Sequence, residues 1–378
     1  MTEFETSPGL PRGFVFASGL ATPIVLRPTG LVGGAAGAAM VAAGTGRRLG
    51  EGNLVFGAVE AFLHGEQAVT VAVATLDAVA DWAAAEGAPA AQLVPALLNR
   101  LATRPAPFAG LTFERPRIMG VVNVTPDSFH AESAFGDTQA AIDHGIALAA
   151  AGAGIVDVGG ESSRPGAEPI PVTAELDRVI PVVRGLASAG IATSVDTRRA
   201  AVMAQAIAAG ARVVNDITAL SGDADSLAVV AGSDASVVLM HMQGASETMQ
   251  DAPHYDHAPY EVYRALEARI IACQAAGIPA ARIAVDPGIG FGKTVAHNMQ
   301  IIDGLALFHG LGCAVMAGAS RKSFIGRLDP GADSGMRLPG SIAATVLAAG
   351  QGVQLHRGHD VAEARQALAV WHAATGAG

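Results

Sequence analysis

The sequence predicts an α/β protein, a (β/α)8 TIM barrel preceded by a small N-terminal α/β extension. Two observations lead to this fold class. From Arg117 onward, short apolar runs rich in β-branched residues alternate with longer Ala-rich runs of helical character. Eight such strand-like runs lie within residues 117 to 376, a length that matches a closed eight-stranded barrel. A doubly wound open parallel sheet is the alternative that this pattern leaves open.

Residues 1 to 110 are predicted to form a separate extension of unknown role. They contain a strand-like run at residues 24–28 and helical stretches at residues 75–85 and 90–102. The small residues of the run 31–44 are too few to span a bilayer, so we expect a buried or interface helix there. Residues 103–117 contain three prolines, which indicates a linker that leads into the barrel.

The barrel domain is predicted at residues 117–376, and its strands follow in order. The strand-like runs lie at residues 117–123, 155–161, 191–196, 212–217, 236–242, 282–288, 313–320 and 353–360. Helical runs lie between them, among others at residues 138–152, 172–190, 198–210 and 260–277. Continuously apolar strands followed by helices are typical of a parallel sheet that helices cover.

Composition and charge exclude several classes of function. The chain carries a net charge of -10, which argues against nonspecific binding to nucleic acid or to a membrane surface. An anionic substrate would therefore need a local cluster of cations. The only cysteines, Cys273 and Cys313, lie far apart in apolar segments and predict reduced, buried thiols. With no signal peptide at the N-terminus, the expected location is cytoplasmic.

Polar residues follow the apolar runs at the point where each strand is expected to end. They are Asn123, Glu161 with Arg164, Asp196, Asn215, His241, Asp286, Ser320 with Lys322, and Arg357 with His359. One such residue alone has an ordinary structural explanation, since strand ends often bond to loop backbone. Eight strand ends together predict an active site, because they meet on one face of a barrel.

The residue types at these strand ends suggest two kinds of recognition. Asp196, Asn215 and Asp286 suit a flat heterocycle with an aminopyrimidine edge, because carboxylates accept from paired N–H donors. A second group is cationic and fits a phosphate or diphosphate at the barrel mouth. Its members are Arg164, Lys322, Arg357 and His359.

Two further motifs do not carry chemistry on their own. The segment DPGIGFGKT at residues 286–294 has Pro287 where a nucleotide-binding phosphate loop requires its first glycine. We expect its glycines to permit tight turns or a close approach to a ligand. His254 and His257, in the segment HYDH, are only two potential ligands in a predicted loop, which does not suffice for a metal site.

The motifs as a set resemble those of dihydropteroate synthases, and the resemblance covers essentially all of residues 117–376. The segments are MGVVNVTPDSF, DVGGESSRPGA, SVDT, VVNDI, VVLMHMQG, VDPGIGFGKT, ASRKSFIG and HRGHDV, in the family's order and spacing. Several are shared in part with pterin-dependent methyltransferases, which remain an alternative. The Ser-Arg-Lys and Arg-x-His segments favour the synthases.

The resemblance implies the condensation of 6-hydroxymethyl-7,8-dihydropterin diphosphate with 4-aminobenzoate, which gives 7,8-dihydropteroate and diphosphate. It implies Mg2+ as cofactor, with Asn123 as metal ligand, and catalytic roles for Asn123, Lys322, Arg357 and His359. Asp196, Asn215, Met240, Asp286 and Lys322 match the pterin pocket, and Asn123, Arg164, Arg357 and His359 the diphosphate site. Ser163, Arg164, Pro165, Phe291 and Ser320 would surround the aminobenzoate. The family is commonly dimeric, so a homodimer through barrel helices, including residues 340–350, is a further expectation.

The chain departs from the family pattern at two places. Ser163 stands where the family usually has Thr, which retains the hydroxyl. After Phe129 the family normally continues Ser-Asp-Gly-Gly, whereas this chain has HAESAFGD at residues 130–137. This first loop closes over the aminobenzoate site in the family. The departure leaves open a pterin-binding paralogue without catalysis or with a different acceptor.

Overall fold

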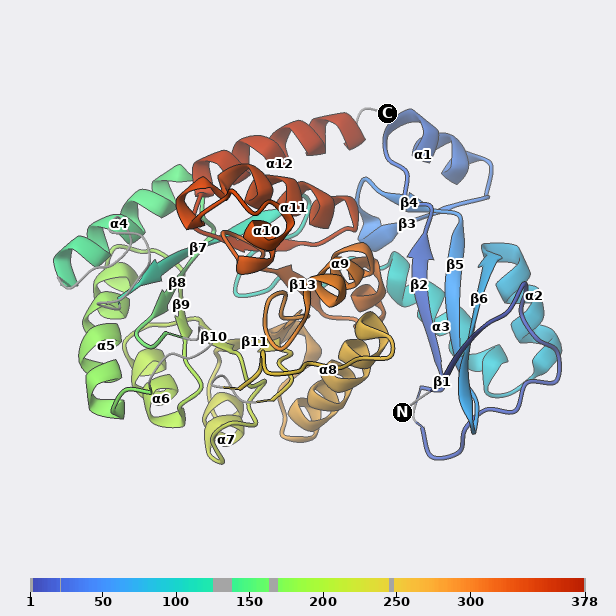
Figure 1. Cartoon of the computed structure of the whole chain (residues 1–378), viewed down its shortest axis with the longest axis horizontal. Coiled ribbons are helices and arrows are strands. Elements are labelled where there is room, and N and C mark those ends of the chain that lie inside the picture. Colours follow the sequence, from blue (N-terminus) through green and yellow to red (C-terminus); the bar gives the residue numbers. More distant parts are fainter. Residues whose placement is uncertain (1–2, 21, 125–137, 163–168, 245–247, 377–378) are drawn as a thin grey trace.

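The structure is a computed structural model that describes residues 3–20, 22–124, 138–162, 169–244 and 248–376. It contains an open four-stranded sheet near the N-terminus and a closed barrel of eight parallel strands (Figure 1). The closed ring of strands confirms the predicted barrel, and the doubly wound alternative is wrong. No helix within the described ranges is long and apolar enough to cross a membrane.

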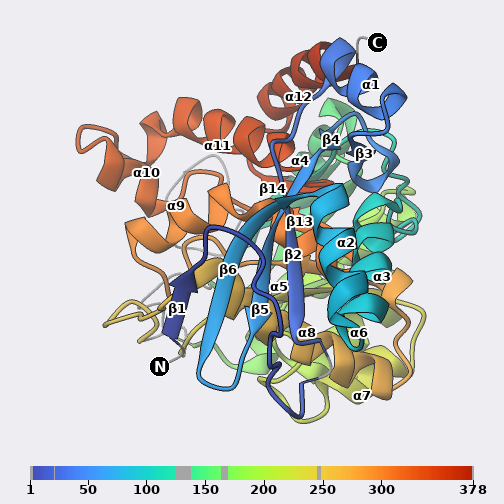
Figure 2. The same ribbon diagram turned by 90° about the vertical axis from the view of Figure 1, so that its right-hand side faces the viewer.

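The N-terminal part is built around the four-stranded sheet, in the order β1-β6-β5-β2. The strands are β1 (Glu3–Thr6), β2 (Ile24–Thr29), β5 (Ala58–His64) and β6 (Ala68–Thr75). The helices are α1 (Gly34–Ala42), α2 (Leu76–Glu86) and α3 (Ala90–Ala102), with the short strands β3 (Arg47–Arg48) and β4 (Val55–Phe56) and the 3-10 turn η1 (Leu49–Glu51). Figure 2 turns this sheet toward the viewer, with β1 and β2 at its edges. The predicted strand and both predicted helices are confirmed.

Strands β2 and β5 of the N-terminal sheet bury apolar side chains on both faces of the sheet, because successive residues of a strand point to opposite sides. Leu26 and Leu63 pack with α2 and α3 in one apolar cluster. Val25, Phe62 and Val69 point the other way and belong to the same cluster as residues of the barrel. The extension is therefore docked on the barrel through a shared core.

The helix predicted in the small-residue run at 31–44 is present, but most of it is not buried. Helix α1 forms at Gly34–Ala42, but Gly37 is its one buried residue. Alanine and glycine present little apolar surface to bury. The helix lies at the surface near the end of α12 (Val361–Gly376), where the C-terminus is also found (Figure 1).

All eight predicted barrel strands are confirmed, and each pairs with its neighbours in parallel. They are β7 (Arg117–Asn123), β8 (Ile155–Gly159), β9 (Thr193–Asp196), β10 (Val213–Asp216), β11 (Ser236–Met240), β12 (Ile283–Asp286), β13 (Ala314–Ala317) and β14 (Leu355–Gly358). The ring closes between β9 and β10, and β14 returns to β7. Every strand thus points its carboxyl end to the same face.

The helices between the strands surround the barrel (Figure 1). They are α4 (Thr138–Ala151), α5 (Val172–Ser188), α6 (Ala200–Ala208), α7 (Ser226–Ala231), α8 (Ala258–Ala275), α9 (Val295–Asp303), α10 (Ser323–Leu328), α11 (Leu338–Gly350) and α12. Short 3-10 turns add η2 (Ala280–Arg282), η3 (Leu305–Leu311) and η4 (Ser334–Met336). The four helices predicted from Ala-rich runs correspond to α4, α5, α6 and α8.

The predicted linker does more than connect the two parts. Phe108 and Phe113 belong to an apolar cluster with Met119, Ile155 and Leu355. This lower barrel cluster fills the end of the barrel at which the strands begin. Phe108 and Leu111 form an isolated bridge that turns the chain back on itself. The linker therefore closes the end of the barrel opposite the carboxyl ends of the strands.

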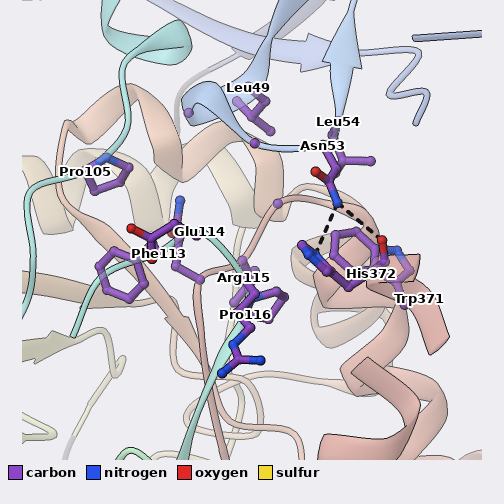
Figure 3. A pocket seen from close by; sticks show the side chains of 15 residues that line it. Leu49, Asn53, Leu54, Pro105, Phe113, Glu114, Arg115, Pro116, Trp371 and His372 are labelled. Carbon is purple, nitrogen blue, oxygen red and sulfur yellow. Dashed lines mark hydrogen bonds between the residues drawn. The ribbon is translucent and has the colours of Figure 1, made fainter. Parts of the chain in front are cut away.

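A small cavity lies between the N-terminal part and this closed end of the barrel (Figure 3). Its volume is about 50 Å3, enough for a few water molecules. Asn53 donates from Nδ2 to His372 Nδ1 at 3.1 Å across its edge. Pro116 and Val353 in its wall precede the first and last barrel strands, so the cavity lies on the face away from the strand tips.

Candidate active site

The polar strand ends predicted from the sequence meet at one mouth of the barrel. Those inside the mouth are Asn123, Asp196, Asn215, Asp286 and Arg357, from β7, β9, β10, β12 and β14. Gly159 pairs in register with both Asn123 and Asp196. A Cβ atom at position 159 would lie 3.7 Å from Asn123 Oδ1 and 3.8 Å from Asp196 Oδ2. The two side chains therefore border the same small space.

Arg357 joins two carboxylates inside the mouth. Its Nε donates to Asp157 Oδ2 at 2.7 Å, and its Nη2 donates to Asp196 Oδ2 at 2.7 Å. Asn215 Nδ2 donates to the same oxygen of Asp157 at 2.9 Å. Asp157 is fully buried, and its bonds thus fix the orientation of the guanidinium and of the amide. The assignment of Arg357 to a diphosphate site stays a prediction.

Three charged groups in the mouth have pKa values that burial moves toward neutrality. Burial raises the pKa of Asp196 to about 7, with the Arg357 guanidinium acting in the opposite direction. Burial also raises the pKa of Asp286, which the Lys322 ammonium opposes. For Lys322, burial lowers the pKa to about 8, and Asp286 opposes that change. Groups that change charge near neutral pH are characteristic of active sites.

The backbone after β12 brings Lys322 to Asp286. Gly288 N donates to Asp286 Oδ1 at 2.7 Å, which turns the chain immediately after the strand. Lys322 Nζ donates to the carbonyl oxygen of Ile289 and lies 4.6 Å from the centre of the Phe291 ring. A cation at this distance from a ring is favourably placed. The segment 288–291 thus forms one wall of the pocket.

Lys293 holds this wall from the inside. It is 1% exposed, and its Nζ donates to the carbonyl oxygens of Gly288 and Phe291 at 3.0 Å each. It also donates to His241 Nδ1 at 3.1 Å. Burial lowers the pKa of Lys293 to about 7 and that of His241 to about 3, which keeps the imidazole neutral as an acceptor. Met240 is buried, and its Cγ would lie 3.4 Å from a Cβ atom added at Gly288.

Ser320 and His359 lie together at the ends of β13 and β14. The Ser320 oxygen is 3.1 Å from His359 Nδ1 and accepts from the His359 backbone N–H at 3.3 Å. Between them in sequence, Arg321 has a positive φ of 57° and forms an ion pair with Asp360. A residue predicted to contact aminobenzoate is thus adjacent to one predicted to contact diphosphate.

The residues present fit a magnesium ion that is held jointly with a substrate. Within the described ranges, no three His, Cys, Asp or Glu side chains gather as a metal cluster. Asn123 instead offers one amide oxygen beside Asp196 at the mouth. Magnesium in proteins commonly keeps several waters and binds through one or two protein oxygens together with substrate phosphates. This donor set suits that arrangement better than a cage made of protein alone.

Some predicted residues are not placed, and some residues of the site were not predicted. Ser163, Arg164 and Pro165, and the first loop at 125–137, lie outside the described residues. Asp157 was missed, although an acidic residue within an apolar run could have revealed it, because a buried charge requires partners. Lys293 was also missed, because the carbonyl oxygens and the imidazole that it binds come together only when the loop folds.

Comparison with known proteins gives a consistent result. The pterin binding enzyme family profile matches residues 119–359. The dihydropteroate synthase of Escherichia coli K12 is 43% identical over 69% of this chain and 92% of its own length. That of Mycobacterium leprae is 42% identical over 67% of this chain and 92% of its own.

Solved structures agree with these sequence matches. Xanthomonas albilineans dihydropteroate synthase with 4-aminobenzoic acid is 48% identical, with a TM-score of 0.65 over 70% of this chain and 96% of that one. The Yersinia pestis enzyme in a sulfonamide drug complex is 41% identical, with a TM-score of 0.67 and the same coverage. The chain therefore belongs to the pterin-binding enzyme family, with dihydropteroate synthases as its similar members.

Proposed function

We propose that this protein is a dihydropteroate synthase, which joins 6-hydroxymethyl-7,8-dihydropterin diphosphate to 4-aminobenzoate. The observation that carries the proposal is the enclosed set of Asp196, Asn215, Asp286 and Lys322 at the barrel mouth. This set occurs in a chain more than 40% identical to synthases over most of their length. A related structure holds 7,8-dihydropteroate, the product of this reaction.

The pterin ring would bind with its aminopyrimidine edge toward the carboxylates. Asp286 and Asp196 accept from N–H groups when they are ionised, and an amide such as that of Asn215 both donates and accepts. Lys322 can donate to a ring oxygen or nitrogen. Met240 packs at the wall and offers an apolar contact for the ring face.

The reaction breaks the bond between the pterin methylene carbon and the diphosphate oxygen, and the diphosphate leaves with the bonding electrons. The amine lone pair of 4-aminobenzoate then forms the new C–N bond and releases a proton to solvent. The carboxylates Asp196 and Asp286 stabilise positive charge that develops on the methylene carbon. No strong base is required, because an aniline nitrogen is neutral and nucleophilic.

Mg2+ is the proposed cofactor, with the Asn123 amide oxygen as its protein ligand. The ion supplies charge neutralisation on the departing diphosphate. His359, and Arg164 outside the described residues, are the proposed cationic partners of the same group. The fit of one amide oxygen to a substrate-bound ion supports this assignment.

The aminobenzoate site is proposed to lie between Phe291 and Ser320, with residues 163–165 completing it. The relative from Xanthomonas albilineans was solved with this acid, which supports the choice of acceptor. The sequence at residues 130–137 departs from the family pattern, which motivates a test against the alternative of a different acceptor. Competition between 4-aminobenzoate and other arylamines in one reaction separates the two.

We expect a cytoplasmic homodimer. Cys273 and Cys313 are unpaired and buried, as in proteins of reducing compartments. Leu347 on α11 and Val370 on α12 are 59% and 68% exposed on helices that touch each other. Light scattering should report a dimer that Leu347→Glu converts to a monomer. A monomeric native protein would reject this part of the proposal.

Genetic complementation tests the function. Expression in a bacterium that lacks its own dihydropteroate synthase should restore growth without the end products of folate metabolism. Asp286→Ala, expressed at the same level, should not restore growth, because the pterin pocket loses the buried carboxylate proposed to accept from the ring. Absence of growth with abundant soluble native protein would oppose the proposal.

A further inference from the structure

The N-terminal sheet makes an aromatic contact with the start of helix α8. The Phe4 ring from β1 stacks on the His257 ring, with centroids 5.0 Å apart and planes at 28°. Phe62 from β5 meets the edge of His257 at 5.1 Å and stacks on Tyr260 at 5.4 Å. Tyr260 is 3% exposed, so these rings form part of the continuous core between the extension and the barrel. Strands β1 and β5 of the extension thus both contact the start of helix α8.

His257 fixes the point at which α8 begins. Its Nδ1 accepts from the backbone N–H of Tyr260 at 3.3 Å, as an N-cap residue does. Its own backbone N–H donates to Glu261 Oε1 at 2.7 Å. From the extension, His64 Nδ1 is 2.7 Å from the Tyr260 hydroxyl. The extension therefore contacts His257, the N-cap residue at which the preceding loop joins helix α8.

That preceding loop holds the wall of the candidate pterin pocket. Tyr255, two residues before His257, is buried and donates from its hydroxyl to the carbonyl oxygen of Gly292 at 3.0 Å. Its ring lies 5.8 Å from Lys293 Nζ. Gln250 of the same loop donates to the carbonyl oxygen of Gly290 at 2.8 Å. The loop thus binds the 288–293 segment at two backbone oxygens.

The 288–293 segment in turn positions the pocket. Its carbonyl oxygens receive Lys293 and Lys322, and Gly288 N–H bonds to Asp286. A series of contacts thus runs from Phe4 to His257, continues along the backbone to Tyr255, and reaches the groups that would bind the pterin.

We propose that the N-terminal extension is an intramolecular brace that positions the pterin pocket, with Tyr255 as the positioning residue that links the two. The proposal rests on the proposed function only for the identity of the ligand. Phe4, Phe62 and His64 fix the position of the start of α8. Tyr255, just before it, then fixes the 288–293 wall through its hydrogen bond to the Gly292 carbonyl oxygen. This gives a role to the extension and to the HYDH segment.

A double-mutant cycle tests the linkage. Tyr255→Phe removes one hydrogen bond and keeps the ring, and Phe4→Leu removes the stacking and keeps an apolar side chain. Each should raise the KM for the dihydropterin diphosphate roughly three- to tenfold, as expected for one buried contact. The KM for 4-aminobenzoate should rise as well, because Phe291 belongs to the same 288–293 wall and borders the proposed aminobenzoate site. Because both act through one series of contacts, the double variant should show less than the product of the two effects.

A matched control separates this role from general loosening of the extension. Thr22→Val removes the hydroxyl bonds of the extension with Arg264 and Glu267, farther along α8, and leaves Tyr255 and His257 untouched. The bond from Arg264 to the Thr22 carbonyl oxygen remains. It should leave both KM values unchanged. His257→Asn keeps a capping acceptor but loses the ring, and it should behave like Phe4→Leu.

Hydrogen exchange of the substrate-free protein gives a readout that needs no activity. Phe4→Leu and Tyr255→Phe should speed exchange of the amides at 288–293 and leave those of β8 and β9 unchanged. Unchanged exchange at 288–293 in Phe4→Leu, or effects on KM that simply multiply in the double variant, would overturn the brace. If the two variants showed accelerated exchange at 288–293 but the native protein had no synthase activity, the result would support the brace and count only against the proposed function.

Discussion

Arg357 and Asp157 are 200 positions apart in sequence, and they form a 2.7 Å hydrogen bond between Nε and Oδ2 inside the barrel mouth. The same Asp157 oxygen accepts from Asn215, and the same guanidinium reaches Asp196. Asp157 itself is not a strand-tip residue, since it lies in the middle of β8, and it is fully buried. Its role is to fix the orientation of the groups above it.

Replacement of Asp157 by Ala should lower the free energy of unfolding by about 3 kcal/mol, because it leaves the Arg357 charge largely without its buried partner. Urea denaturation of the purified variant measures this. Asp157→Asn retains an acceptor of similar shape and should lose less. If Asp157→Ala unfolded within about 0.5 kcal/mol of the native protein, Asp157 would have no organising role.

The pH dependence of kcat/KM for the dihydropterin diphosphate should be bell-shaped, with its maximum between about pH 7 and about pH 8. Asp196 is protonated below its pKa of about 7 and then loses the charge that stabilises the methylene cation. Lys322 is deprotonated above its pKa of about 8 and then loses its positive charge. Activity should therefore rise through the first pKa and fall through the second.

Two variants assign the limbs of this profile. Asp196→Asn should reduce activity and flatten the acid limb. Lys322→Arg should move the alkaline limb to higher pH, because a guanidinium stays charged. An alkaline limb at the same pH in Lys322→Arg would show that another group is responsible.

Gly288→Ala should abolish pterin binding. Gly288 has a φ of +70°, and an added Cβ atom would lie 1.9 Å from the carbonyl oxygen of His241. The backbone would have to move, and with it the N–H that bonds to Asp286. Gly350→Ala is the control, since a Cβ atom there meets nothing within 4 Å. Titration calorimetry with the dihydropterin diphosphate should find normal affinity in the control alone.

Phe108→Ala should cost about 3 to 5 kcal/mol of stability, because it leaves a cavity at the closed end of the barrel. Phe108 is 1% exposed and packs in the lower barrel cluster. It lies on the face opposite the strand tips, so the KM values of the folded variant should not change. Thermal unfolding and steady-state kinetics measure the two effects separately, and a raised KM would mean that the two faces are coupled.

The barrel could be predicted from the sequence because its determinants are local. Each strand is a short apolar run, and its polar end marks the carboxyl tip, as at Asn123, Asp196 and Asp286. Parallel pairing then brings all tips to one face without knowledge of individual contacts. For this reason the eight strands and the position of the site were predicted together.

The contacts that organise the site depend on pairs distant in sequence. Asp157 meets Arg357 only after the barrel closes, and Lys293 meets His241 only after the loop folds. The same holds for the extension, since nothing near Phe4 in sequence indicates that it stacks on His257. The run of small residues at 31–44 predicts a buried or interface helix, yet the small side chains of α1 bury too little surface to require burial.

The central claim is that this protein makes dihydropteroate. The most direct measurement follows diphosphate and dihydropteroate together, with purified protein, Mg2+, dihydropterin diphosphate and 4-aminobenzoate. The account predicts release of the two products in equal amounts, at a rate that Asp286→Ala reduces to background. Binding of the diphosphate substrate without formation of dihydropteroate would contradict it and would identify the chain as a pterin-binding protein with another acceptor or none.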